Sequence, residues 1–183
     1  MLRVGVLVAA AVAISAMLAE YGGAARQGNA FTVKDLVADR APSVANHDAS
    51  LVNGWGLSAG PTTPWWAANN GTNTSTLYDG TGKKQALTVA VAGRPTGTVF
   101  NGSATDFPVS QNGKSGAARF LFASEAGRIP GWSPTVNGTV AVPAVDRSSR
   151  KAIYKGLAIL NSRLYATDFH NNRVDVFDAS FKR

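Results

Sequence analysis

The chain has 183 residues, of which 45% are hydrophobic and 16% charged, and 18 Lys and Arg against 11 Asp and Glu give a net charge of +7. This length suits one domain with its own core, and the composition is too apolar for a disordered chain. With no Cys and two His, the sequence excludes disulfides, thiol catalysis, Fe–S clusters and metal centres built from Cys or several His.

The first 25 residues have the layout of a secretory signal peptide. Arg3 precedes residues 4–19, which contain neither charge nor proline, and the small residues 22–25 follow. A bilayer span needs ~20 apolar residues, so this run is short for a permanent anchor. We expect export to a secreted or periplasmic location, with no stable membrane span after cleavage. An uncleaved N-terminal anchor is the alternative.

From residue 31 onward the apolar residues alternate with polar ones, which predicts strands. In the last of them, Val174 and Val176 share one face and Asp175 the other, so we expect the valines inside and the carboxylate in solvent. No segment after residue 31 has the pattern of a long amphipathic helix. The predicted strands are residues 31–37, 87–91, 96–100, 119–124, 138–142, 156–160, 163–167 and 173–178.

Turn signals separate these strands. Asn-Gly pairs begin at Asn53, Asn70, Asn101, Asn112 and Asn137, and Asp79-Gly80 adds a sixth signal. Both residues of such a pair tolerate the positive φ of a type I′ hairpin turn. The sequence therefore predicts an all-β domain with tight reversals rather than βαβ crossovers.

One segment recurs along the chain. Residues 66–79 and 165–178 align without a gap at an offset of 99, each reading aromatic-Ala strand, Asn-rich loop, strand ending in aromatic-Asp. A degenerate copy lies between them, with residues 98–100 as its first strand and 122–125 as its aromatic-Ala strand. Copies of about 50 residues are in the range of propeller blades, which must stack because one blade cannot bury both faces.

The segment 156–178 resembles an NHL-type propeller repeat, and segments 48–57 and 72–80 are similar to a family of exported bacterial proteins of unknown function. This resemblance implies a β-propeller for residues 31–183 and transfers no catalytic residue. Family members are about twice as long, and a closed ring needs about four to eight blades. We therefore expect a partial propeller of about three blades, completed by missing blades, which we favour, or by a second chain.

Candidate ligand-binding residues lie in the expected loops. Asn53 precedes a first strand, where propeller sites point toward the central channel, and it is a weak metal candidate. Asp168 and His170 share a loop, where they could bind a divalent cation, although Asp in a tight turn also simply satisfies backbone groups. Trp65 and Trp132 lie near Pro and Gly, where exposed rings could stack on sugars.

We expect a binding or scaffold module for an extracellular ligand, such as a glycan or an acidic surface, rather than an enzyme, and no cofactor. Scattered cations without interleaved aromatic residues argue against nucleic acid. One alternative is a divalent-metal-dependent hydrolase of the lactonase type, with Glu, Asn and Asp around the channel; another is a structural envelope protein. Ser58 matches a nucleophile elbow, but Pro61 and Pro64 exclude the helix that this motif needs.

Overall fold

The structure is a computed structural model that describes residues 31–41 and 44–183. The predicted signal segment, residues 1–25, lies outside the described residues. By its internal contacts the chain divides into two units, Met1–Lys34 and Asp35–Arg183, and every strand of the described residues belongs to the second. None of the described helices has the length and hydropathy to cross a bilayer.

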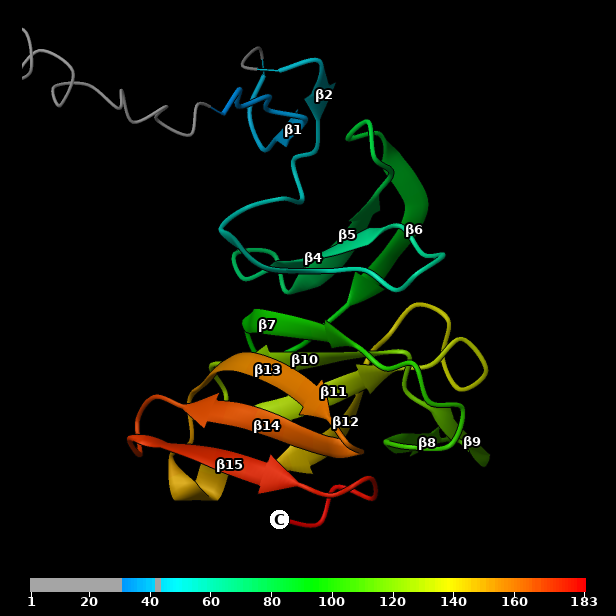
Figure 1. The fold of residues 1–183 in the computed structure, drawn as a ribbon, viewed down its shortest axis with the longest axis vertical. Coiled ribbons are helices and arrows are strands. Elements are labelled where there is room, and N and C mark those ends of the chain that lie inside the picture. Colours follow the sequence, from blue (N-terminus) through cyan, green and yellow to red (C-terminus); the bar gives the residue numbers. More distant parts are fainter. Residues whose placement is uncertain (1–30, 42–43) are drawn as a thin grey trace, which may run out of the picture. The chain divides into compact units, whose positions relative to one another are not determined.

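Strands dominate the described residues, which confirms the prediction of an all-β domain with several antiparallel sheets (Figure 1). Sheet 1 consists of β3 (Gly54–Ser58), β4 (Trp65–Asn69), β5 (Thr74–Tyr78) and β6 (Lys84–Ala90). Sheet 2 consists of β7 (Pro95–Phe100), β10 (Phe120–Ser124), β11 (Arg128–Trp132) and β12 (Val142–Asp146). Sheet 3 consists of β13 (Tyr154–Leu160), β14 (Arg163–Asp168) and β15 (Arg173–Phe177).

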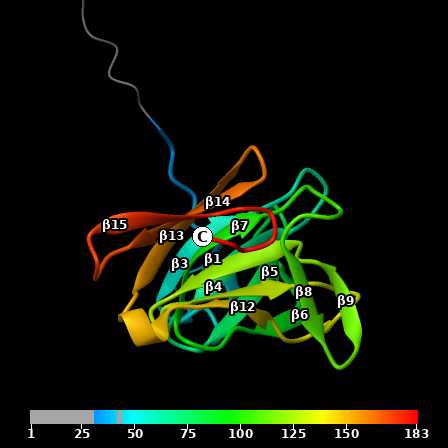
Figure 2. The same cartoon turned by 90° about the horizontal axis from the view of Figure 1, so that it is seen from below.

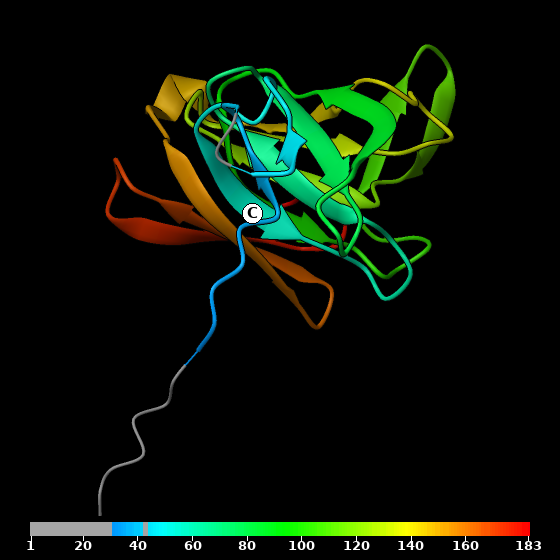
Figure 3. The same ribbon diagram turned by 90° about the horizontal axis from the view of Figure 1, so that it is seen from above.

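The remaining elements are short. Strands β1 (Val37–Ala38) and β2 (Asn46–His47) pair in parallel, and the hairpin of β8 (Pro108–Gln111) and β9 (Lys114–Ala117) is inserted within sheet 2. The 3-10 turn η1 (Ser148–Arg150) connects sheets 2 and 3. In Figure 3, the orange and red strands of sheet 3 lie on one side and the yellow-green hairpin projects on the other.

The three sheets share one design. Within each, sequential strands are antiparallel neighbours, and the first two strands carry the same β-bulge, in which two residues of the first strand lie opposite one residue of the second. The pairs that flank the bulge are Gly54–Asn69 and Leu57–Ala67, Pro95–Ser124 and Thr98–Phe122, and Tyr154–Asp168 and Leu157–Ala166. The predicted recurrence of residues 56–79 in 156–178 is therefore confirmed, and the degenerate copy folds alike.

The first core layer lies between sheets 1 and 2. Trp66 from β4 is buried, and its ring stacks on Phe120 from β10 with centroids 4.1 Å apart. Phe122 and Trp132 pack against the same indole, at 6.4 and 4.7 Å. Each aromatic pair adds about 0.5–1.5 kcal/mol beyond the burial of its area, so these rings hold sheet 1 on sheet 2.

The second core layer lies between sheets 2 and 3. Leu121 is buried there together with Leu164 from β14 and Phe177 from β15. Neighbouring residues of a strand point to opposite faces of its sheet. Phe120 therefore packs in the first core layer and Leu121 in the second, although both belong to β10. This alternation stacks the sheets in chain order.

The first strands β3, β7 and β13 lie next to one another, with β7 in the middle (Figures 1 and 2). Glycine permits this, because a Cβ added at Gly56 would lie 2.5 Å from Thr98 N, and one added at Gly97 would lie 2.8 Å from Gly156 Cα. Gly56, Gly97 and Gly156 occupy the same position in the three bulges. We call the side formed by these three strands the inner edge.

Two predicted strands are wrong or displaced. Residues 31–36 form no strand, and only Val37 of that prediction lies in β1. The strand predicted at 138–142 begins at Val142 instead, because the Asn137 side chain accepts the N–H groups of Thr139 and Val140 and so organises a turn.

The turn prediction holds for one of its six sites among the described residues. Asn112 and Gly113 have φ of 51° and 76° and close the β8–β9 hairpin, as a type I′ turn requires. At Asn101, by contrast, the side chain donates to Ala118 O and accepts the N–H of Ser103, which fixes a longer loop. The side chain of Asn, rather than its tolerance of positive φ, determines such a loop.

The predicted faces of β15 are reversed. Asp175 and Phe177 are buried, whereas Val174 is 53% exposed. Asp175 is accommodated because it accepts the Tyr154 hydroxyl at 2.7 Å and pairs with Arg173 Nε at 2.9 Å. The valines lie on the face where no further sheet of the described residues packs. Alternation thus detects the strand but not which face is covered.

Candidate functional site

Polar side chains from all three sheets meet at one end of the inner edge. Asn53, just before β3, donates through Nδ2 to Asn70 Oδ1 at 3.1 Å. Asn70, just after β4, donates in turn to Glu125 Oε2 at 3.2 Å, and Glu125, just after β10, also accepts from Lys155 Nζ of β13. We call this cluster, completed by Trp55 and Arg94, the junction site.

The shared design of the sheets explains why these residues meet. In each sheet the N–H after the second strand donates to the carbonyl before the first strand. The donors and acceptors are Asn70 and Asn53 at 3.1 Å, Glu125 and Arg94 at 3.1 Å, and Phe169 and Ile153 at 2.9 Å. Equivalent positions of neighbouring sheets therefore lie side by side where the inner edge begins.

Positive φ angles mark the same place. Asn53 has φ of 51° and its counterpart Arg94 has φ of 62°. Asn adopts this region readily, whereas Arg does so at a cost that the surroundings must offset. The Arg94 N–H donates to Asn73 Oδ1 at 2.7 Å and its carbonyl accepts from Asn70 Nδ2 at 3.2 Å. The backbone at the junction site is thus held by side chains.

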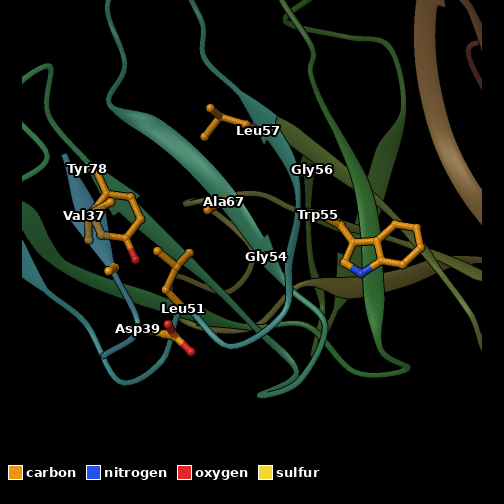
Figure 4. Close-up of a pocket in the computed structure, with 10 residues that line it drawn as sticks. Val37, Asp39, Leu51, Gly54, Trp55, Gly56, Leu57, Ala67 and Tyr78 are labelled. Atoms are coloured by element: carbon orange, nitrogen blue, oxygen red, sulfur yellow. The ribbon is translucent and has the colours of Figure 1, made fainter. Parts of the chain in front are cut away.

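An aromatic ring lies within this polar cluster. Trp55 is 50% exposed, and its indole N–H donates to Asn53 Oδ1 at 3.2 Å. Lys155 Nζ lies 4.5 Å from the ring centroid, a cation–π geometry. Figure 4 shows the Trp55 ring directed away from Leu51 and Tyr78. The site therefore combines an accessible aromatic surface with amide, carboxylate and ammonium groups.

Glu125 is the electrostatic centre of the site. The hydrogen bond from Lys155 lowers the pKa of Glu125, whereas partial burial raises it. The hydrogen bond from Asn70 and the charge of Arg94 lower this pKa further, and Arg94 Nε lies 3.2 Å from Glu125 Oε2. The carboxylate is therefore ionised at neutral pH. Two cations against one carboxylate leave the cluster with one excess positive charge.

A cavity of about 420 Å³ opens beside the junction site, on the face of sheet 1 that is turned away from sheet 2 (Figure 4). Leu57, Ala67 and Tyr78 form much of its wall. Behind that wall Asp48 is buried and accepts the Tyr78 hydroxyl at 2.6 Å and Lys84 Nζ at 2.7 Å. Burial alone would raise the pKa of Asp48, but Lys84 and Tyr78 hold it below its ordinary value.

The structure brings one of the predicted site residues, Asn53, into the junction site. Asp168 is buried and accepts Asn171 Nδ2 at 2.6 Å and the Ile153 N–H at 3.1 Å. Burial would raise the pKa of Asp168, yet these hydrogen bonds keep it lowered. His170 is exposed on the same turn. The ligand roles of these residues stay predictions.

The loop positions expected for two tryptophans are wrong. Trp65 begins β4 and is 48% exposed, on the face opposite to Trp66. Trp132 ends β11 and is buried, because its ring packs on Trp66 and its indole N–H donates to Gly138 O at 3.0 Å. Trp132 therefore has no free ring face for a sugar, whereas Trp65 has one.

Sequence reasoning missed Trp55, Asn70, Glu125 and Lys155 as members of one site. The repeat could have revealed them, since Asn70 and Glu125 occupy equivalent positions after the second strand of their sheets. The alignment of the degenerate copy placed Phe122 opposite Trp66, but the strand register makes it equivalent to Ala67. Because of that one-residue shift, the alignment paired Glu125 with Asn69 instead of Asn70.

Comparisons with known proteins find relatives in a virus. Acanthamoeba polyphaga mimivirus encodes Uncharacterized protein L690, 30% identical over 159 residues, and Uncharacterized protein R648, 27% identical over 169 residues. The matches cover 82% and 88% of this chain and 42% of each relative. Uncharacterized protein R640 of the same virus is 33% identical over 87 residues, 48% of this chain and 16% of the relative. The chain thus spans less than half the length of these relatives.

The predicted membership in an exported bacterial family with NHL-type repeats is wrong. No family model matches the chain, and the relatives found are viral proteins. The segments that suggested this membership were 156–178 for the NHL-type repeat and 48–57 and 72–80 for the bacterial family.

Two solved structures are similar to the chain at low scores. The computationally designed Ika4 protein has a TM-score of 0.39 and 12% identity over 80% of this chain and 99% of its own. Virginiamycin B lyase from Staphylococcus aureus has a TM-score of 0.33 and 10% identity over 70% of this chain and 56% of its own.

Proposed function

We propose that residues 35–183 form part of a β-propeller that acts as a binding or scaffold module. Three antiparallel sheets of one design, stacked in chain order with their first strands along the inner edge, support this proposal. Propellers place the first strand of each blade at the central channel and bind ligands at the ends of those strands. The junction site lies at one end of the inner edge, which is where the proposed propeller would bind a ligand.

The proposal includes further sheets of the same kind. Tyr165, Thr167, Val174 and Val176 form the face of sheet 3 that is turned away from sheet 2. The equivalent face of sheet 1, which carries Trp66, is covered by sheet 2. Two relatives are more than twice as long as the segments that they share with this chain, which supports a further sheet on this face.

The ligand that suits the junction site best is a glycan. Flat aromatic rings pack on sugar faces, and neighbouring amide, carboxylate and ammonium groups form hydrogen bonds with the sugar hydroxyls. The observation that carries this assignment is the half-exposed Trp55 ring surrounded by polar groups from three sheets. An extracellular location, reached through residues 1–25, is part of the same proposal.

The alternative, a metal-dependent hydrolase of the lactonase type, would need Glu, Asn and Asp side chains around a channel. Across 31–41 and 44–183, no three His, Asp or Glu side chains lie together in a way that could hold a metal ion. Asn53, the residue that suggested a metal, is engaged with Asn70 and Trp55.

A glycan array probed with the full chain tests the proposal. We expect binding to selected glycans, and we expect Trp55→Ala to weaken it about tenfold or more, the loss typical of a central aromatic contact. Trp65→Ala is the matched control, since Trp65 is 48% exposed and lies outside the junction site. Glycan binding that survives Trp55→Ala but is lost in Trp65→Ala would contradict the assignment.

A further inference from the structure

A second cavity lies at the end of sheet 3 and is lined almost entirely by arginine. Its volume is about 330 Å³, and its lining residues are Arg147, Arg150, Asn171, Arg173 and Arg183. Arg147 directly precedes the 3-10 turn η1, and Arg150 ends it. Asn171 lies in the turn between β14 and β15, Arg173 begins β15, and Arg183 is the last residue described. No carboxylate and no apolar side chain lines this cavity, which we call the arginine pocket.

Two buried carboxylates hold two of the arginines in place. Asp175 Oδ1 lies 2.9 Å from Arg173 Nε and 2.8 Å from Arg183 Nε. Asp168 Oδ2 lies 3.5 Å from Arg173 Nη2. Both side chains are thus fixed through Nε, and the terminal nitrogens of Arg183 stay available for another acceptor. Such pre-orientation lowers the entropy that a ligand would otherwise have to supply.

The other two arginines have no such partner. Within the described residues, no carboxylate lies within ion-pair distance of Arg147 or Arg150. Arg147 Nε is buried and has no hydrogen-bond acceptor in the described part of the chain. A buried donor without an acceptor is costly, so this atom favours an acceptor from beyond the described residues. Four guanidinium groups against two carboxylates leave the arginine pocket with two uncompensated positive charges.

The fold does not require these charges. The positions of Asp168 and Asp175 are occupied in sheet 1 by Asn69 and Thr76, in the same register. There a neutral hydrogen bond of 2.9 Å from Asn69 to Thr76 connects the two side chains instead. Because sheet 1 has neutral side chains at these two positions, the strand arrangement alone does not require the carboxylates, and in sheet 3 they also position the arginines.

We propose that the arginine pocket binds a tetrahedral oxyanion, a phosphate or sulfate group. Guanidinium groups are planar and always charged, and they present paired N–H donors that match the oxygens of such groups. The cavity corresponds to roughly ten waters at about 30 Å³ each, so it accepts the oxyanion together with part of the molecule that carries it. The site is separate from the junction site and does not depend on the glycan assignment.

Titration calorimetry on the full chain tests this inference, with inorganic phosphate, sulfate and acetate compared at constant ionic strength in chloride. Phosphate and sulfate should bind and the planar acetate should not, and the tighter of the two identifies the preferred group. Arg147→Gln and Arg150→Gln should each weaken binding about tenfold or more, because each removes a charge-assisted hydrogen bond. Arg150 is exposed, so its variant leaves folding intact.

The control is Lys114→Gln. Lys114 is an exposed cation at the start of β9, outside the arginine pocket, and its substitution removes the same charge. It should change the affinity for phosphate less than about twofold, as expected for a screened charge outside the pocket. Failure of both oxyanions to bind, or an equal loss in Lys114→Gln and Arg150→Gln, would overturn the inference.

Discussion

Trp66→Ala should lower the free energy of unfolding by about 3–5 kcal/mol, the range for removing a large aromatic side chain from a core. The indole is 2% exposed and contacts rings of Phe120, Phe122 and Trp132. The other buried residues of sheet 1 in this layer, Ala68, Leu77 and Val89, are all smaller than Trp66, so they cannot fill the cavity by small shifts. Urea unfolding followed by circular dichroism measures the change.

The control for this substitution is the preceding residue. Trp65 is 48% exposed and points to the opposite face of β4, so Trp65→Ala should cost only about 1 kcal/mol, in proportion to the area that it buries. A similar loss in both variants would mean that sheet 1 does not pack on sheet 2 through the Trp66 face.

Gly56→Ala should destabilise the protein by about 3 kcal/mol, the upper end of the cost of overpacking. The new methyl group would lie 2.5 Å from Thr98 N and 2.6 Å from Thr96 O, and neither atom can move without shifting strand β7. A flexible side chain could yield at little cost, but these obstacles are backbone atoms. The loss should appear as a lower urea midpoint with an unchanged slope.

Gly80→Ala provides the matched comparison. No atom lies within 4 Å of a Cβ built at Gly80, so this variant should stay within about 0.5 kcal/mol of the parent protein. Equal effects of the two substitutions would show that the loss of glycine flexibility, rather than the close approach of β3 and β7, determines the cost.

The sequence predicted much of the fold because strand periodicity and repetition are local properties. Strands β7, β10, β13, β14 and β15 fall where alternation placed them, within one or two residues at their ends. The prediction failed where side chains override local preference. Asn137 and Asn101 organise loops through their amide groups, and Asp175 is buried because Tyr154 and two arginines neutralise it.

Most residues of the two candidate sites could not be predicted from the sequence. Asn53 was found because it precedes a first strand, but its partners Asn70 and Glu125 are 17 and 72 residues away along the chain. Only the register of three stacked sheets brings them together. The arginine pocket likewise joins Arg147 to Arg173 and Arg183. These last two are held by Asp175, which the sequence pattern placed in solvent, and Arg173 also pairs with Asp168, which the pattern placed in a loop.

The central claim is that one sheet design occurs three times in the same register. Nuclear Overhauser contacts between backbone protons of the first two strands test it most directly. We predict such contacts for Leu57 with Ala67, Thr98 with Phe122, and Leu157 with Ala166, the pairs that follow the three bulges. A register displaced by one residue in any one of the sheets would exchange its two faces and contradict this account.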